Sequence, residues 1–206
     1  MKPGKQGPTE GPLAWRVVRL VLLGAPGAGK GTQAATLAEH FGLPHISSGD
    51  LLRDQVAAGT ELGRRLAAHL DRGELVPDEI VTEAVEDALA DTPSSGYVLE
   101  GFPRTVSQAR RADTLQAEGL ADAVVLLELV DDLARQRLAE RAAEGRSDDR
   151  DPEVIERRLR RFHAVTEPLV AYYRGRGVLA TVDADQPPEA VTVDILAALD
   201  AERGAP

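Results

Sequence analysis

Residues 24–32 read Gly24-Ala25-Pro26-Gly27-Ala28-Gly29-Lys30-Gly31-Thr32, and this stretch decides how the 206-residue chain folds. It follows an apolar run over 17–23 that predicts a strand, and it opens a periodic segment over 30–40 that predicts a helix. Glycines let the backbone curl so that several N–H groups point inward, and a helix N-terminus adds positive potential. The stretch therefore predicts a phosphate-binding loop, with Lys30 reaching the β- and γ-phosphates of a nucleotide. A simple glycine-rich turn is the alternative, and it leaves a lysine at this offset unexplained.

Arginine supplies nearly all the positive charge of the chain. Of the 24 basic residues only Lys2, Lys5 and Lys30 are lysines, and the first two lie in residues 1–15, which we expect to be a disordered tail. A compact ammonium and a planar guanidinium are not equivalent partners for an anion. The sequence thus indicates that position 30 requires a point charge.

Apolar runs and helical periods alternate along the rest of the chain. Besides 17–23, strands are predicted at 97–99, 124–129 and 178–182. Helices are predicted at 48–56, 62–70, 77–90, 105–116, 131–143, 152–173 (interrupted near Pro168) and 188–201. Alternating strands and helices favour a parallel sheet covered on both faces. We predict an α/β fold, a P-loop three-layer fold with a central five-stranded parallel sheet flanked by helices, in a single domain over 16–206.

The composition excludes several classes of protein. A formal charge of −10 makes DNA or RNA an unfavourable partner. No apolar run approaches the ~20 residues that span a membrane, and the N-terminal residues contain no apolar stretch of signal-peptide length. The absence of cysteine removes disulfides, thiol catalysis and Cys-based zinc sites. We therefore expect a cytoplasmic protein without nucleic-acid or membrane partners and without structural zinc.

The sequence after Lys30 differs from that of most phosphate-binding loops. Gly31 stands where a Ser or Thr usually holds Mg²⁺, and Thr32 follows it. This sequence is similar to that of the nucleoside monophosphate kinases, and of the adenylate kinases in particular. Further segments carry the same resemblance in order: HISSGDLLR at 45–53, GELVP at 73–77, and GFPRT at 101–105 followed by Gln108. The resemblance covers nearly the whole chain after the tail. It implies a helical monophosphate-binding arm over 47–76 and a short lid over 141–151.

The resemblance also implies which residues bind each nucleotide. The ATP site would comprise Gly27, Ala28, Gly29, Lys30, Gly31, Thr32, Arg137, Arg141 and Gln186. The AMP site would comprise Ser48, Arg53, Glu74, Leu75, Val76, Gly101, Phe102, Pro103, Arg104, Gln108, Arg146 and Arg158. Catalysis would rest on Lys30, Arg104, Arg141, Arg146 and Arg158, with Arg157 as the competing choice for the last.

The chemistry of these side chains agrees with the resemblance. A guanidinium holds phosphate oxygens bidentately, and the amide of Gln108 offers one donor and one acceptor to an adenine edge. Each has a plainer explanation when taken singly: Gln108 as an exposed helix residue, Arg53 as half of a helix salt bridge, and the arginines over 137–158 as a charged surface with local carboxylates. The phosphate-binding loop favours the functional interpretation over these plainer ones. Phosphoryl transfer is catalysed mainly by positioning the two substrates and by cations that stabilise the transferring charge.

Glu100 marks a second departure, because the family usually has Asp before the glycine at 101. By resemblance this carboxylate, together with Asp50, would orient water molecules on Mg²⁺ rather than bind the metal directly. Glu is one methylene longer, which shifts the geometry. We expect Mg²⁺ to accompany ATP. Many bacterial relatives carry a longer lid, sometimes with zinc on four cysteines, and no such zinc site fits this chain.

These residues together indicate a kinase that converts ATP and AMP reversibly into two ADP and so maintains the balance of adenine nucleotides. We expect it to be a monomer. No general base is required, because the AMP phosphate is already an anionic nucleophile at about pH 7. A UMP/CMP kinase is the nearest alternative, and Glu100 leaves open a sensor that binds ATP and AMP without turnover. A GTPase or DNA-directed ATPase is disfavoured by Gly31 and by the acidic charge. Both ATP and GTP stay candidate donors.

Overall fold

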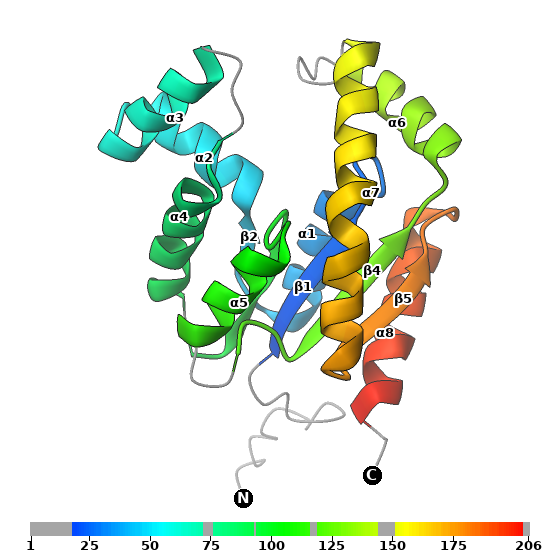
Figure 1. Ribbon diagram of the computed structural model, residues 1–206. Coiled ribbons are helices and arrows are strands. Elements are labelled where there is room, and N and C mark those ends of the chain that lie inside the picture. The colour runs from blue at the N-terminus through cyan, green and yellow to red at the C-terminus, as the bar shows by residue number, and fades with distance from the viewer. Residues whose placement is uncertain (1–17, 72–75, 93, 116–118, 144–150, 204–206) are drawn as a thin grey trace, which may run out of the picture.

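The computed structural model describes residues 18–71, 76–92, 94–115, 119–143 and 151–203 (Figure 1). The predicted tail over 1–15, the predicted site residues Glu74, Leu75 and Arg146, and most of the predicted lid over 141–151 lie outside the described residues. In the described part of the chain, no helix combines the length and the apolar character that crossing a bilayer demands.

Five parallel strands form the centre of the fold. They are β1 (Val18–Gly24), β2 (His45–Ser47), β3 (Gly96–Glu100), β4 (Ala123–Glu128) and β5 (Leu179–Asp183), hydrogen-bonded in the order β2-β3-β1-β4-β5. β1 takes the central place because its apolar run has no polar face: Leu20, Val21 and Leu22 are fully buried. A parallel strand covered by helices on both sides needs such a run.

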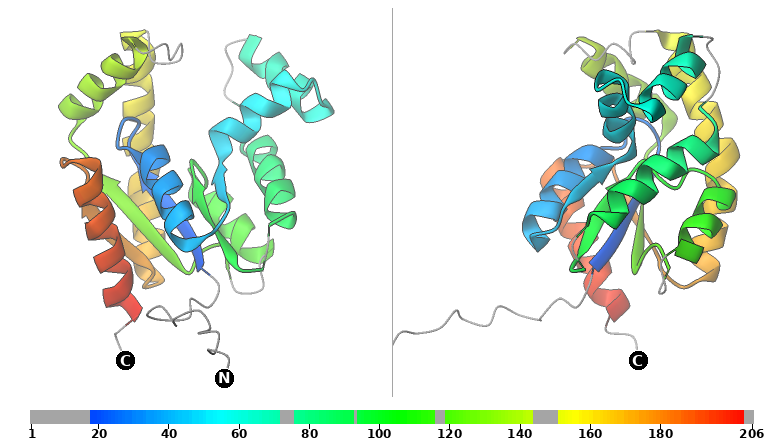
Figure 2. Two further views of the ribbon diagram at one scale, coloured as in Figure 1. Left: turned by 180° about the vertical axis from the view of Figure 1, so that it is seen from behind. Right: turned by 90° about the vertical axis from the view of Figure 1, so that its left-hand side faces the viewer.

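Helices cover both faces of this sheet, which confirms the expected three-layer α/β fold (Figure 2). α1 (Lys30–Phe41) and α8 (Pro188–Arg203) pack on one face. α4 (Asp78–Ala90), α5 (Val106–Leu115) and α7 (Pro152–Gly175) pack on the other. The remaining helices, α2 (Ser48–Ala57), α3 (Glu61–Asp71) and α6 (Asp131–Ala143), lie beyond the carboxyl ends of the strands with the first half of α7, in two groups on opposite sides.

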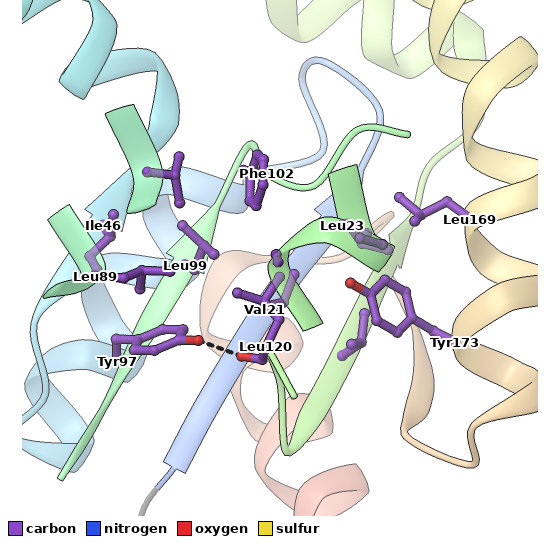
Figure 3. Close-up of a cluster of buried hydrophobic side chains, with 14 of the residues drawn as sticks. Val21, Leu23, Ile46, Leu89, Tyr97, Leu99, Phe102, Leu120, Leu169 and Tyr173 are labelled. Carbon is purple, nitrogen blue, oxygen red and sulfur yellow. Dashed lines mark hydrogen bonds between the residues drawn. The ribbon is translucent and has the colours of Figure 1, made fainter. Parts of the chain in front are cut away.

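The apolar cluster under α4, α5 and α7 anchors the loops that carry polar side chains (Figure 3). Phe102 is 1% exposed and packs in this cluster directly after the end of β3. The hydroxyl of Tyr97 donates a hydrogen bond to the carbonyl oxygen of Leu120, which links β3 to the segment before β4. Leu169 and Tyr173 bring α7 into the same cluster.

Two predictions about elements need correction. The strand β2 was not among the predicted ranges. It has only three residues, at the edge of the sheet, and these are exposed, buried and half-buried in turn, which is too short a run to show a hydrophobic period. The helix over 152–173 is not interrupted near Pro168, since α7 runs unbroken from Pro152 to Gly175. Proline removes one backbone hydrogen bond. Here the burial of Leu169 and Tyr173 on the sheet holds the helix together beyond that point.

Candidate active site

A cavity of about 1050 Å³ opens at the carboxyl ends of the central strands. Its wall includes the loop between β1 and α1, residues at the ends of β2 and β3, and one side each of α6 and α7. The sheet order diverges here, because β3 and β2 lie on one side of β1 whereas β4 and β5 lie on the other. Open α/β sheets bind ligands at such a switch point.

The loop between β1 and α1 is shaped by glycines. Gly27 has a φ of 86°, and a side-chain carbon there would lie 2.9 Å from the carbonyl oxygen of Ala134, so α6 packs directly on the loop. Gly29, with a φ of 83°, immediately precedes the first residue of α1. The predicted ATP-binding residues of this loop all line the cavity: Gly27, Ala28, Gly29, Lys30, Gly31 and Thr32. The first N–H groups of α1 have no partner within the helix, which suits an anion.

Lys30 is the ammonium at the centre of the cavity wall. Its Nζ donates hydrogen bonds to the carbonyl oxygens of Gly24, at 2.9 Å, and Ala25, at 2.8 Å. Burial lowers the pKa of Lys30 to about 8; the charge of Glu100 opposes that shift, and those of Arg104, Arg158 and Arg141 add to it. The ammonium is therefore held by carbonyl dipoles among other cations, an arrangement that an entering polyphosphate would stabilise.

Glu100 ends β3 beside this loop. A side-chain carbon at Gly31 would lie only 3.3 Å from Oε1 of Glu100, so the glycine leaves space for the longer carboxylate. Nε2 of His45 lies 3.5 Å from the same oxygen. Burial alone would raise the pKa of Glu100, but the hydrogen bond from His45 and the charge of Lys30 outweigh it and bring the pKa below its usual value. Glu100 is thus an ionised carboxylate facing the cavity.

Arg53 and Arg104 line the side of the cavity near α2. Nη2 of Arg53 lies 2.5 Å from Oδ1 of Asp50, so its charge is already balanced in part. Nε of Arg104 donates to the carbonyl oxygen of Gly101 at 2.7 Å. Solvent reaches Arg104 from the cavity, yet burial lowers its pKa, and the charges of Arg161 and Arg158 lower it further. These neighbouring cations show that the cavity collects positive charge.

Gln108 does not lie in the cavity wall, although the sequence predicts it as an adenine contact. It is 3% exposed, and its Oε1 accepts a hydrogen bond from the backbone N–H of Arg104 at 2.6 Å. Its Nε2 donates to Oδ1 of Asp78 at 3.0 Å, and Oδ2 of Asp78 accepts from the hydroxyl of Thr105 at 2.8 Å. The observed role of Gln108 is to hold the segment that presents Arg104.

Three other predicted AMP-binding side chains pack behind the cavity surface rather than along it. Phe102 belongs to the buried apolar cluster, and Val76 packs at its edge. Ser48 is fully buried, and its hydroxyl has no hydrogen-bond partner among the described residues. A side-chain carbon at Gly101, where φ is 76°, would lie 2.5 Å from that hydroxyl, so the contact requires glycine. Gly101 and the adjoining Pro103 do line the cavity.

The end of the cavity next to α6 and β5 carries the other predicted ATP contacts. Arg137, Arg141 and Gln186 all line it. Nη2 of Arg137 donates to the carbonyl oxygen of Ala184 at 2.9 Å, which joins α6 to the segment after β5. Nε2 of Gln186 donates to the carbonyl oxygen of Asp183 at 3.0 Å and to Oδ2 of Asp194 at 2.8 Å.

One face of α7 forms the wall opposite α2. Arg158 lines the cavity, whereas Arg157 is exposed on another side of the helix, 3.8 Å from a carboxylate oxygen of Glu153. Arg161 lies one turn further along the cavity face, and it was not predicted from the sequence. Its spacing of three residues from Arg158 was the signal that could have revealed it, because such residues share a helix face. His45, beside Glu100, was also not singled out as a contact.

Comparison with known proteins agrees with this arrangement. A family model described as adenylate kinase matches residues 22–178. An adenylate kinase of Thermobifida fusca (strain YX) is 47% identical over 186 residues, covering 88% of this chain and 98% of the relative. Adenylate kinase 1 of Nostoc sp. (strain PCC 7120) is 46% identical over 186 residues, covering 89% and 99%. An adenylate kinase of Thermus thermophilus is 45% identical over 183 residues, covering 87% and 96%.

Proposed function

This chain belongs to the adenylate kinase family, and from that membership we propose how its own side chains transfer a phosphoryl group from ATP to AMP. It is a nucleoside monophosphate kinase, a phosphotransferase of the reaction that converts ATP and AMP into two ADP. The observation that carries the proposal is the convergence of Lys30, Arg104, Arg141 and Arg158 on one cavity beside a phosphate-binding loop.

ATP binds along the loop over 24–32, with its adenine toward α6 and the segment after β5. The backbone N–H groups at the start of α1 and the ammonium of Lys30 hold the β- and γ-phosphates. Arg137 packs near the base, where its hydrogen bond to Ala184 already orients it. Gln186 lines the same end of the cavity.

AMP binds at the end of the cavity lined by α2 and by the segment after β3. Arg53 and Arg104 receive its phosphate, because both guanidiniums line that end. Gln108 reaches the adenine only if its hydrogen bonds to Arg104 and Asp78 rearrange. This requirement makes AMP binding and the position of Arg104 dependent on each other.

Transfer follows from this placement. An oxygen of the AMP phosphate attacks the γ-phosphorus of ATP in line, the bond to the β–γ bridging oxygen breaks, and that oxygen stays on ADP. The AMP phosphate needs no base to become a nucleophile, since it is anionic at about neutral pH. Lys30, Arg104, Arg141 and Arg158 stabilise the charge that spreads over the transferring oxygens.

Mg²⁺ fits the carboxylate that faces the cavity. Glu100 is ionised beside Lys30, and Asp50 lines the cavity as well, so both can hold water molecules of a magnesium ion without binding the metal directly. When bound, the ion would neutralise negative charge on the β- and γ-phosphates.

The arm over 47–76 and the lid over 141–151 close on the nucleotides in this proposal. Closure excludes water, which would otherwise accept the phosphoryl group. We further propose that the enzyme acts as a monomer in the cytoplasm, the compartment that supplies ATP and AMP. Size-exclusion chromatography with light scattering tests the monomer, and a mass near twice 22.0 kDa would contradict it.

Parallel assays of ADP formation test the function. The protein is supplied with ATP, Mg²⁺ and either AMP, CMP or UMP, and AMP is expected to give the fastest turnover. Faster turnover with CMP would identify a UMP/CMP kinase instead. Binding of ATP and AMP without ADP formation would identify a sensor. Replacing ATP by GTP in the same assay measures the choice of donor.

A further inference from the structure

The cavity face of α7 presents two guanidiniums, not one. Arg158, Arg161, Phe162, Val165, Thr166 and Leu169 all line the cavity, and their spacing follows one stripe of the helix. Leu169 is buried against the sheet, so it fixes how the stripe is turned. Arg161 therefore faces the cavity because of the packing of the helix that carries it.

Arg161 differs from Arg157 and Arg160, its neighbours on α7, in its surroundings. Arg157 lies 3.8 Å from Glu153, and the charge of Arg160 acts on Glu156. Within the described residues, no carboxylate pairs with Arg161. Arg161 is an exposed cation in the lining of the cavity. Without a paired carboxylate its planar guanidinium is available to an entering anion and suits phosphate oxygens.

Arg161 shares the cavity lining with Arg104 and acts on its charge. Arg161 is the neighbour whose charge acts most strongly on Arg104, ahead of Arg158. The cations that act on Lys30 are instead Arg104, Arg158 and Arg141. Among the cavity cations, the charge of Arg161 is thus felt by Arg104, the proposed acceptor-phosphate contact, and is not among the main influences on Lys30.

We propose that Arg161 is a further phosphate contact of the acceptor nucleotide. Beside Arg53, it forms with Arg104 and Arg158 a group of three guanidiniums for the phosphate monoester of AMP. The inference rests on the proposed function, because it takes the Arg104 end of the cavity as the acceptor site. It explains why three like charges converge there: each repels the others until a dianion binds among them.

Calorimetric titration of AMP alone tests the inference in Arg161→Gln, with Arg160→Gln as the matched control. Both variants remove one positive charge from α7, but Arg160 lies with Pro152, Glu153, Glu156 and Arg157 on the far side of the helix from the cavity. Arg161→Gln is expected to weaken AMP binding roughly tenfold, the usual effect of losing one charge-assisted hydrogen bond. Arg160→Gln is expected to stay within about twofold of the wild type, as is common for an exposed substitution.

Two further measurements separate binding from a structural role. The KM for AMP is expected to rise about tenfold in Arg161→Gln while the KM for ATP changes less than about twofold. The melting temperature of the ligand-free variant should equal or exceed that of the wild type, because a repulsive charge has been removed, whereas the stabilisation added by AMP should shrink.

The inference is overturned if Arg161→Gln binds AMP as the wild type does, or if it weakens ATP and AMP alike. A wild-type protein that binds AMP but forms no ADP would instead contradict the proposed function. The AMP titration would still show whether Arg161 contributes to AMP binding.

Discussion

Lys30 illustrates how one side chain is prepared for a polyanion before any nucleotide arrives. Its ammonium donates to the carbonyl oxygens of Gly24 and Ala25, so it is held at the inner edge of the loop. Burial and the neighbouring arginines make the charge costly, and its pKa drops to about 8. Bound phosphates would remove that cost, which means that part of their binding appears as stabilisation of Lys30.

Replacing Lys30 with Met removes this charge while keeping an unbranched side chain of similar length. We expect kcat to fall by ~10² or more, because a positioned cation that stabilises developing phosphoryl charge contributes several kcal/mol. Steady-state ADP formation measures the effect, and circular dichroism with thermal melting checks that the variant folds. Activity within a few-fold of the wild type would contradict the role of Lys30.

The pH dependence of kcat/KM for ATP should report the same group. The active form is the ammonium, and in the free enzyme Lys30 loses its proton as pH rises through about 8, so kcat/KM should fall above that pH. In the ATP complex the phosphates favour the ammonium and raise its pKa, so kcat should persist to higher pH. A kcat/KM that stays flat up to about pH 10 would show that Lys30 keeps its ordinary pKa of about 10.4.

At the scale of elements, α4 and the segment after β3 are joined by one carboxylate. Asp78, in the first turn of α4, accepts hydrogen bonds from Gln108 and from Thr105. Gln108 in turn accepts a hydrogen bond from the backbone N–H of Arg104. The element that follows the proposed AMP arm therefore sets the position of a guanidinium on a different loop.

Asp78→Ala should loosen this connection and raise the KM for AMP several-fold. Two charge-assisted hydrogen bonds, each worth about 1.5–3 kcal/mol, are lost, and only a part of that free energy acts on AMP through the position of Arg104. The KM for ATP should change little, because the donor contacts come from other elements. Asp87→Ala is the control, as Asp87 is exposed on the same helix. Equal effects of the two variants on the KM for AMP would rule out a positioning role for Asp78.

At the scale of the whole molecule, the cavity lies between two groups of helices on opposite sides of the carboxyl edge of the sheet. α2 and α3 stand on one side, and α6 with the first half of α7 stands on the other (Figure 1). The cationic residues come from both sides: Arg53 from α2, and Arg141, Arg158 and Arg161 from α6 and α7. A ligand that touches both sides must therefore link them.

A two-headed analogue that joins two adenosines through a polyphosphate should make this link. At a concentration about 1,000 times its Kd it should stabilise the protein by about 4 kcal/mol, a rise in Tm on the order of 10 °C for a chain of this size. The radius of gyration from solution scattering should decrease at the same time. ATP alone or AMP alone should give smaller changes. A Tm shift no larger than that of ATP alone would contradict simultaneous binding at both ends.

Local pattern was sufficient for the loop, for four of the five strands and for most helix bounds. Strand β1, the glycine-rich turn and α1 follow one another directly in the chain, so hydrophobic period and glycine placement determine them. The three-residue β2 and the continuity of α7 past Pro168 were not readable, because pairing with β3 and burial against the sheet decide them. Both are contacts between segments far apart in the chain.

The site divides in the same way. The sequence by itself determined which cations the chain offers and predicted that Lys30 and the arginines contact phosphates, since charge and glycine pattern are properties of the residues themselves. Only the tertiary structure decided that Arg158 and Arg161 face the cavity while Arg157 does not, and that Gln108 holds Arg104. The physical reason is that the rotation of a helix, and so the direction of its side chains, follows from which of its faces is buried on the rest of the fold.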